Sequence, residues 1–152
     1  MQVDRFGVRR LYEVDEYRQL ERVQQAVWGF VDADTVPLHV FVAVAKHGGI
    51  VLGLTDTDRP TGEEIVGFAF GFNGRDHHGE KHHSHQVGIE PHAAGSGLGR
   101  RLKWAQREEA IQAGLCRVTW TFDPLMAKNA WFNFRVLGAV SDQYHVDVYG
   151  RI

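Results

Sequence analysis

The 152-residue sequence contains one cysteine, four prolines and no long hydrophobic segment. The single cysteine, Cys116, cannot form an intramolecular disulfide bond, which is typical of proteins from a reducing compartment. No apolar run approaches the roughly 18 residues that a membrane-spanning helix needs, and no basic-then-apolar leader opens the chain. We therefore expect a cytoplasmic protein with no membrane partner. Cys116 begins a predicted strand, and we expect a small buried side chain rather than a nucleophile.

The sequence also lacks an excess of either charge. Its 17 Lys and Arg residues nearly balance 19 Asp and Glu residues, and the formal net charge is −2. Nucleic-acid-binding domains usually carry a basic stripe or a strong positive balance, so no nucleic-acid partner is expected. With 43% hydrophobic residues, the chain is long enough to bury one sizeable core. We expect residues 1–152 to form a single domain.

Hydrophobic periodicity predicts helices over 14–28, 98–113 and 125–138. The segment 38–46 fits either a helix or a strand, and we favour a helix because a strand-like run follows it directly. A polar loop is predicted over 73–81. Alternating or β-branched residues predict strands over 49–54, 63–72, 82–90, 117–123 and 139–150. Hairpins followed by strand–helix alternation indicate a mixed α/β (α+β) sheet with helices on its faces.

A glycine-rich turn opens the helix predicted over 98–113. It contains Gly95, Gly97 and Gly99, and Arg100 and Arg101 follow at once. Glycines leave backbone N–H groups uncovered, and the start of a helix attracts anions. Cations in a first helical turn are unfavourable by up to about 1 kcal/mol unless an anion binds there. The turn therefore predicts a pyrophosphate site, with an ordinary glycine-rich loop as the alternative.

The spacing of this turn excludes two common phosphate-binding loops. The loop of nucleotide hydrolases needs Gly-Lys-Ser or Gly-Lys-Thr, and the sequence contains neither. The dinucleotide fingerprint needs G-x-G-x-x-G after a first strand. Here the spacing is G-x-G-x-G, two-thirds of the way along the chain.

A third type of loop fits, because the stretch Ala94-Gly95-Ser96-Gly97-Leu98-Gly99 resembles the signature of the GNAT superfamily of acyl-CoA-dependent N-acyltransferases. The strand ending Ile89-Glu90-Pro91 is also common in that family. Further similarity to a group of acetyltransferases lies in His83-Ser84-His85, in residues 121–125 and in Leu137-Gly138-Ala139. The order of predicted elements is that of the family as well, so the resemblance covers nearly the whole chain.

The resemblance implies a fold, a ligand and an assembly. The fold is a mostly antiparallel sheet of about six strands, splayed between the fourth and fifth strands and flanked by about four helices. The ligand is acetyl-CoA or another acyl-CoA, which serves as cosubstrate, and no metal is implied. Family members continue into a seventh strand, so we expect a C-terminally short sheet or one completed by a second copy in a homodimer.

The resemblance also implies site residues. Freed backbone groups of Val87, Gly88 and Ile89 would bind the pantetheine arm, and one N–H there, assigned to Val87, would stabilise the oxyanion. Asn129 matches an asparagine that contacts the pantetheine end. The pyrophosphate would be held by Ala94, Gly95, Ser96, Gly97, Leu98, Gly99 and Arg100. Two departures stand out: Ala94 replaces an Arg or Gln, and Phe134 replaces a tyrosine that protonates the leaving thiolate.

Proton transfer has several candidates. His83 and His85 lie two apart on one strand, share a face, and carry imidazoles whose usual pKa suits a general base. Glu90 is a weaker candidate base, and Tyr144 or Tyr149 are candidate acids. The cluster of histidines also leaves a zinc site open as an alternative. Its members are His77, His78, His82, His83 and His85.

Together these features predict an N-acyltransferase that moves an acyl group from acyl-CoA to a primary amine by direct attack. The acceptor is expected to be a small molecule such as an amino acid, and the acyl group acetyl, with succinyl as an alternative. Two other functions stay open: a non-catalytic acyl-CoA-binding or regulatory module, and a histidine-rich metal-binding protein.

Overall fold

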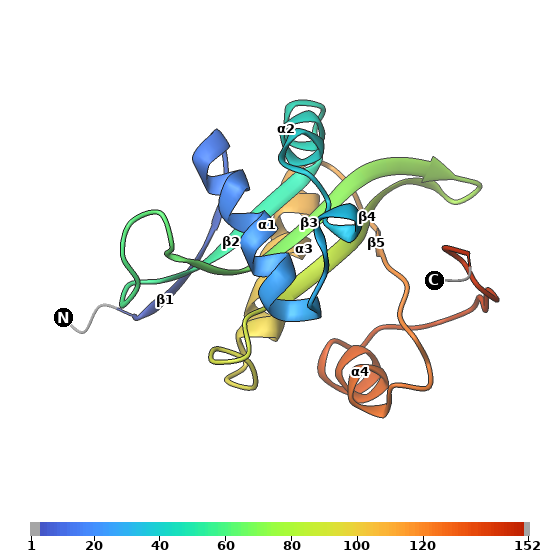
Figure 1. Ribbon diagram of the computed structural model, residues 1–152. Coiled ribbons are helices and arrows are strands. Elements are labelled where there is room, and N and C mark those ends of the chain that lie inside the picture. Colours follow the sequence, from blue (N-terminus) through green and yellow to red (C-terminus); the bar gives the residue numbers. More distant parts are fainter. Residues whose placement is uncertain (1–3, 151–152) are drawn as a thin grey trace. The chain divides into compact units, whose positions relative to one another are not determined.

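The computed structural model describes residues 4–150 (Figure 1). The chain divides into two compact units, Met1–Trp120 and Thr121–Ile152. The first unit holds the sheet and three α-helices, whereas the second holds one short helix and irregular chain. Each unit is described by itself.

The sheet in the first unit has the strand order β1-β2-β3-β4-β5. The first four strands pair antiparallel, and β5 pairs parallel with β4. The strands are β1 (Phe6–Arg10), β2 (Ile50–Asp56), β3 (Ile65–Asp76), β4 (Gly79–Ile89) and β5 (Val118–Thr119). Within the described residues the sheet therefore has five strands, not the six that were expected.

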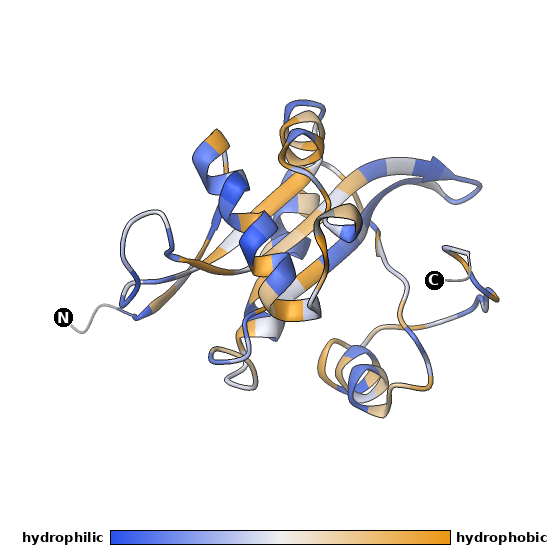
Figure 2. Cartoon of the chain, viewed as in Figure 1, coloured by the Kyte–Doolittle hydropathy of each residue, from blue (hydrophilic) through white to orange (hydrophobic). Residues whose placement is uncertain are grey.

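Helices cover both faces of this sheet (Figure 1). On one face, α1 (Val14–Trp28) and α2 (Leu38–Lys46) pack against Phe68 and Phe70 of β3. A short 3₁₀ turn, Asp32–Asp34, lies between these helices. On the other face, α3 (Leu98–Gln112) packs through Leu102 and Ala110 on β2 and β3. Figure 2 shows β2 and most of β3 as apolar and the far end of the β3–β4 hairpin as hydrophilic.

The second unit contains α4 (Ala127–Trp131), which continues directly into a π-helical turn, Phe132–Val136. The ring of Phe134 meets the ring of Phe122 edge-on, with 5.5 Å between centroids. Residues 139–145 form no regular element, and a turn follows over 146–149. The strand predicted over 139–150 is therefore wrong.

Of the other predictions, two helices are confirmed, whereas a loop, a strand and the burial of Cys116 differ from the structure. The helices over 14–28 and 38–46 are confirmed at both ends. The loop expected over 73–81 is wrong, because β3 and β4 pair across most of it and leave only His77 and His78 at the turn. The strand expected over 117–123 shrinks to two residues. Cys116 is exposed rather than buried.

Candidate functional site

The fourth strand carries a bulge at His85. The pairing of β3 with β4 changes register from Phe70↔Gln86 to Gly71↔Ser84, so His85 is the extra residue on β4. Bulges bend a strand and redirect side chains, and they are frequent beside active sites. Here the bulge turns His85 toward Phe70, with ring centroids 5.6 Å apart.

The outer edge of β4 is paired only at its beginning. β5 contributes two pairs, His82↔Val118 and His83↔Thr119, whereas β4 continues to Ile89. Among residues 4–150 no strand pairs with this edge beyond His83. We call residues 84–89 the open edge of β4. This interruption is the splay that the family resemblance implies.

The hydrogen-bonding pattern between β3 and β4 determines which backbone groups of β4 face the open edge. The N–H of Glu90 donates to the C=O of Val66 over 2.8 Å. Because hydrogen-bonded pairs alternate along an antiparallel ladder, Gly88 directs its backbone groups to β3, while Val87 and Ile89 direct theirs to the open edge. Val87 and Ile89 are therefore the two residues in this part of the strand with backbone groups free to bind a ligand.

Gly88 has a different function from its neighbours. A Cβ atom added at Gly88 would lie 2.8 Å from the Trp28 ring of α1. Trp28 also stacks on Phe30, with 5.3 Å between ring centroids. Gly88 thus lets α1 approach β4, and this aromatic pair borders the strand next to the open edge.

The glycine turn leaves a row of N–H groups at the start of α3. The first hydrogen bond of the helix runs from the N–H of Arg101 to the C=O of Gly97 over 3.1 Å. The N–H groups of Leu98, Gly99 and Arg100 precede this bond and have no acceptor within the helix. They form a site suited to an anion, as the sequence predicts.

The turn itself needs its glycines for their backbone conformation. Gly95 and Gly97 have φ values of 87° and 79°, in the left-handed region that side chains rarely adopt. Ser96 does not cap the helix, because its hydroxyl donates to the C=O of Ala93 over 2.8 Å. The Ser96 hydroxyl therefore does not compete with an anion for the N–H groups at the start of α3.

The two arginines after the turn differ. The guanidinium of Arg101 pairs with Asp4 over 2.8 Å, whereas Arg100 is exposed. Of the two arginines, Arg100 is therefore the better candidate to bind a phosphate group.

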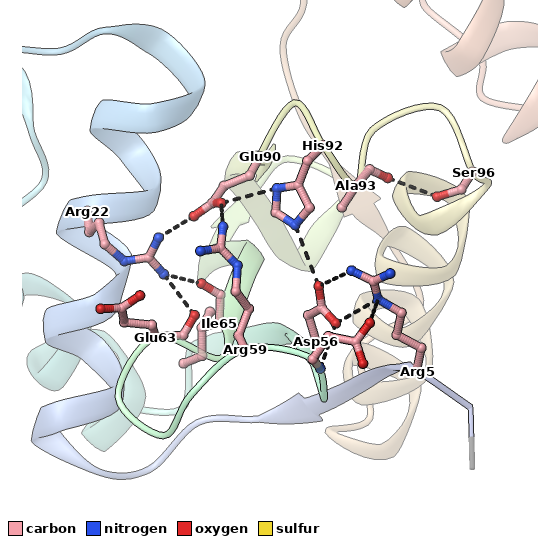
Figure 3. Close-up of polar contacts among 11 residues, drawn as sticks. Arg5, Arg22, Asp56, Arg59, Glu63, Ile65, Glu90, His92, Ala93 and Ser96 are labelled. Atoms are coloured by element: carbon pink, nitrogen blue, oxygen red, sulfur yellow. Dashed lines mark hydrogen bonds and ion pairs between the residues drawn. The ribbon is translucent and has the colours of Figure 1, made fainter. Parts of the chain in front are cut away.

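A buried charge network anchors the start of the turn (Figure 3). The side chain of Glu90 is 5% exposed and pairs with Arg22 of α1 and with Arg59 of the β2–β3 connection, the latter over 3.0 Å. Arg22 also donates to the C=O of Ile65 over 2.6 Å. Glu90 is therefore a structural anchor, and its assignment as a candidate base is not supported by this geometry.

His92 joins this network to a second buried carboxylate. Its two ring nitrogens lie 3.4 Å from Glu90 and 3.6 Å from Asp56. The Asp56 carboxylate accepts two bonds from Arg5, both 2.8 Å long, and the Arg5 hydrogen bond is the main reason that its pKa lies well below the usual range. Residues from β2, α1, the β2–β3 connection and the segment just before β1 thus fix the first residues of the turn.

The two candidate bases lie together on the α1–α2 face of the sheet. The ring of Phe72 contacts both His83 and His85, with centroids 5.4 and 5.9 Å apart. Nδ1 of His83 lies 3.1 Å from the hydroxyl of Thr119. Burial lowers the pKa of both imidazoles, so both are neutral at neutral pH and able to accept a proton.

His82 lies on the opposite face and is completely buried. Its Nδ1 lies 2.9 Å from the amide oxygen of Asn73, and its Nε2 lies 3.2 Å from the amide nitrogen of Gln106. Burial lowers its pKa to about 4. His82 is therefore a neutral core residue, separated by the sheet from His83 and His85.

Sequence reasoning missed Lys103, which is buried beside His82. Its Nζ donates to Ser84 Oγ over 3.0 Å and to Gln106 Oε1 over 3.2 Å, and it lies 4.0 Å from the ring centroid of Trp120. Burial lowers its pKa to about 8. The only available signal was its position four residues after Gly99, one helical turn into α3.

The remaining predicted residues belong to the second unit. Asn129 is exposed on α4, and its amide lies 3.7 Å from the sulfur of Met126. Phe134 lies in the π-helical turn and contacts Phe122. The hydroxyl of Tyr149 lies 3.0 Å from that of Thr121, and Tyr144 is 77% exposed.

The described residues also bear on a metal site and on a membrane span. Residues 4–150 contain no group of three or more His, Cys, Asp and Glu side chains arranged to hold a metal ion. No helix in the same range is long and apolar enough to span a membrane.

Comparison with known families gives a match over most of the chain. The sequence model of the Acetyltransferase (GNAT) family matches residues 8–138. Comparison with curated protein sequences gives no match.

Solved structures share this fold at low sequence identity. An aminoglycoside acetyltransferase from an uncultured soil metagenomic sample superimposes with a TM-score of 0.78 at 14% identity, and the match covers 97% of each chain. Glucosamine-6-phosphate N-acetyltransferase from Arabidopsis thaliana gives 0.71 at 12% identity, covering 94% of this chain and 97% of that one. A transcriptional regulator from Bacillus halodurans gives 0.70 at 19% identity, covering 93% and 97%.

Proposed function

Because the chain belongs to the Acetyltransferase (GNAT) family, we propose that it transfers an acyl group from acyl-CoA to a primary amine of a small molecule. Acetyl is the default group, and succinyl is the alternative. The amine attacks the thioester directly, with no covalent enzyme intermediate and no metal. We also propose a cytoplasmic location, and the single domain over 1–152 and the homodimer stay predictions.

One observation carries the proposal: the N–H groups of Leu98, Gly99 and Arg100 precede the first hydrogen bond of α3, in a turn that no side chain caps. Such a row of amides suits a pyrophosphate. Arg100 adds a positive charge beside it, which explains a cation that would otherwise destabilise the start of the helix.

The open edge of β4 supplies the second part of the site. Backbone groups of Val87 and Ile89 face it and would pair with the amides of the pantetheine arm. The N–H of Val87 would stabilise the oxyanion that forms when the amine attacks. Removing one such donor typically lowers the rate by roughly 10²–10³-fold.

His83 or His85 would take the proton from the attacking amine. Both are neutral at neutral pH because burial lowers their pKa values. The acceptor would then approach from the α1–α2 face of the sheet, where the two imidazoles and the ring of Phe72 lie together.

A charge placed in the first turn of α3 tests the pyrophosphate site. Gly99→Glu puts a carboxylate where the helix favours one, so the fold should be as stable as wild type or slightly more stable. The same carboxylate repels pyrophosphate. We expect calorimetric titration to show CoA affinity at least tenfold weaker (about 1.4 kcal/mol) in Gly99→Glu than in the neutral control Gly99→Gln.

Equal affinities in the two variants would contradict the pyrophosphate site. A thiol-release screen of small amines against acetyl-CoA and succinyl-CoA then identifies the acceptor and the acyl group.

A non-catalytic acyl-CoA-binding module is the second candidate. Phe134, in place of a tyrosine, and Ala94, in place of an Arg or Gln, favour it. Tight CoA binding without thiol release across the amine panel would select this function over the enzyme.

A further inference from the structure

Lys103 places its ammonium group at the point where β4 and β5 part. The last parallel pair is His83↔Thr119, so Ser84 and Trp120 are the first residues beyond the parallel pairing of β4 with β5. Nζ of Lys103 donates to Ser84 Oγ over 3.0 Å and lies 4.0 Å from the Trp120 ring centroid. The ammonium therefore lies at the Ser84 end of the open edge of β4, where the pairing with β5 stops.

This ammonium is buried without a carboxylate. The residue is 9% exposed, and its polar partners are the neutral groups of Ser84 and Gln106. Among the described residues 4–150, Lys103 forms no ion pair with a carboxylate, and burial alone accounts for the lowering of its pKa. A buried lysine normally requires a carboxylate partner, and one that lacks it beside a strand edge open to a ligand is a candidate for function.

We propose that Ser84 donates a proton to the leaving thiolate of CoA and that Lys103 replaces the proton which Ser84 loses. The proposal rests on the proposed acyl transfer. It supplies the acid that Phe134 cannot, since a phenyl ring carries no ionisable proton.

The proton transfers balance. The attacking nitrogen forms a bond to the thioester carbon, and the tetrahedral intermediate collapses when the C–S bond breaks and its electron pair stays on sulfur. The sulfur takes the hydroxyl proton of Ser84, and Ser84 takes a proton from Nζ of Lys103. The proton lost by the amine leaves through His83 or His85, and Lys103 is recharged from solvent after the thiol departs.

The charges around Lys103 suit this transfer. Burial lowers its pKa to about 8, close to that of a thiol. His82 on β4 lies on the same face of the sheet as Lys103, and its pKa is itself lowered. His83 lies on the other face, and the charge of Lys103 contributes to the lowering of its pKa. Arg10 of β1, which pairs with Glu109 of α3 over 2.7 Å, also acts electrostatically on His82.

The test compares two donors that differ in one atom, acetyl-CoA and its selenium analogue, with the best amine of the release screen. A selenolate leaves without a proton, whereas a thiolate benefits from one. Lys103→Met should lower kcat with acetyl-CoA by about 10²-fold and should lower kcat with the selenoester far less. Ser84→Ala should show the same donor dependence.

The pH profile and two further variants complete the test. Wild-type kcat should fall as the pH rises through about 8, where Lys103 loses its proton, and this limb should be missing in Lys103→Met. Lys103→Arg keeps the charge but does not release a proton, so it should fail like Lys103→Met. Lys46→Met, which removes an exposed lysine of α2, should match wild type.

The outcomes separate the two proposals. Wild-type protein that does not bind acetyl-CoA, or binds it and releases no thiol, contradicts the proposed function. An active wild type with Lys103→Met equally impaired on both donors, or with full activity in Lys103→Arg, contradicts the role of Lys103 alone. Titration of CoA into each variant shows that the site is still formed.

Discussion

At the scale of single residues, the identity of the base has a direct test. His83 and His85 are half-buried on one face, and their pKa values lie below the usual 6.5. A base must be neutral, so kcat/KM should rise with pH through a value below 6.5 and reach a plateau near neutrality. Replacing the true base with Asn should lower kcat/KM by about 10²-fold and remove this acid limb.

His47→Asn serves as the control, because His47 is exposed at the end of α2. If neither His83→Asn nor His85→Asn changes the rate or its pH profile, the amine loses its proton to water alone.

The sequence predicted the part of the site that depends on backbone conformation, because that part requires particular residue types. The glycine turn was found because positive φ and uncovered amides require glycine at Gly95 and Gly97. The sequence offers Glu90 as a weaker candidate base, and it gives no sign that Arg22 and Arg59 hold its carboxylate in the fold. Lys103 was missed because long-range packing alone decides that a helical lysine is buried.

At the scale of secondary-structure elements, the bulge in β4 depends on a glycine in the neighbouring strand. A Cβ at Gly71 would lie 2.3 Å from the backbone oxygen of His83 and 2.5 Å from the His82 ring. Gly71→Ala should therefore push β4 away from β3 beside the bulge. We expect a loss of unfolding free energy of about 1–3 kcal/mol and weaker CoA binding.

Gly74→Ala on the same strand is the matched control. No atom lies within 4 Å of a Cβ at Gly74, so its unfolding free energy in urea should stay within about 0.5 kcal/mol of wild type. Equal stability of the two variants would show that β3 and β4 approach less closely at Gly71.

Elements were predicted well where a periodic pattern coincides with a clear end. Helix α1 has the apolar spacing and ends at Gly29, whose φ is 68°. Strand β1 was missed because it is five residues long and ends in two arginines, and pairing with β2 rather than its own pattern makes it a strand. Residues 139–150 alternate like a strand but pair with no strand among the described residues.

At the scale of the whole molecule, the direction of the pKa shifts predicts how stability depends on pH. Eight groups have lowered pKa values: Glu16, Asp56, Glu64, Asp76, His82, His83, His85 and Lys103. Each binds protons less readily in the folded chain than in the unfolded chain. Stability should therefore rise with pH up to about 4.5 through the carboxyl groups, from about 4 to 6.5 through the histidines, and from about 8 to 10.5 through Lys103. Above about 10 the raised pKa of Tyr17 opposes the trend.

Urea unfolding at a series of pH values measures this rise. The part between pH 8 and 10.5 belongs to Lys103, whose displaced pKa corresponds to about 3 kcal/mol, and it should be absent in Lys103→Met. A wild-type stability that is flat or falling over pH 8–10 would contradict the buried ammonium.

The ion pairs of Arg22 and Arg59 with Glu90 limit the order in which these three residues can be substituted during evolution. If Glu90 were replaced by a neutral residue first, Arg22 and Arg59 would both lose the carboxylate that they share. If an arginine left first, the carboxylate would keep one partner and the turn would keep its anchor. Evolutionary substitution in this network should therefore begin with Arg22 or Arg59. A functional homologue that lacks Glu90 should already lack at least one of these two arginines.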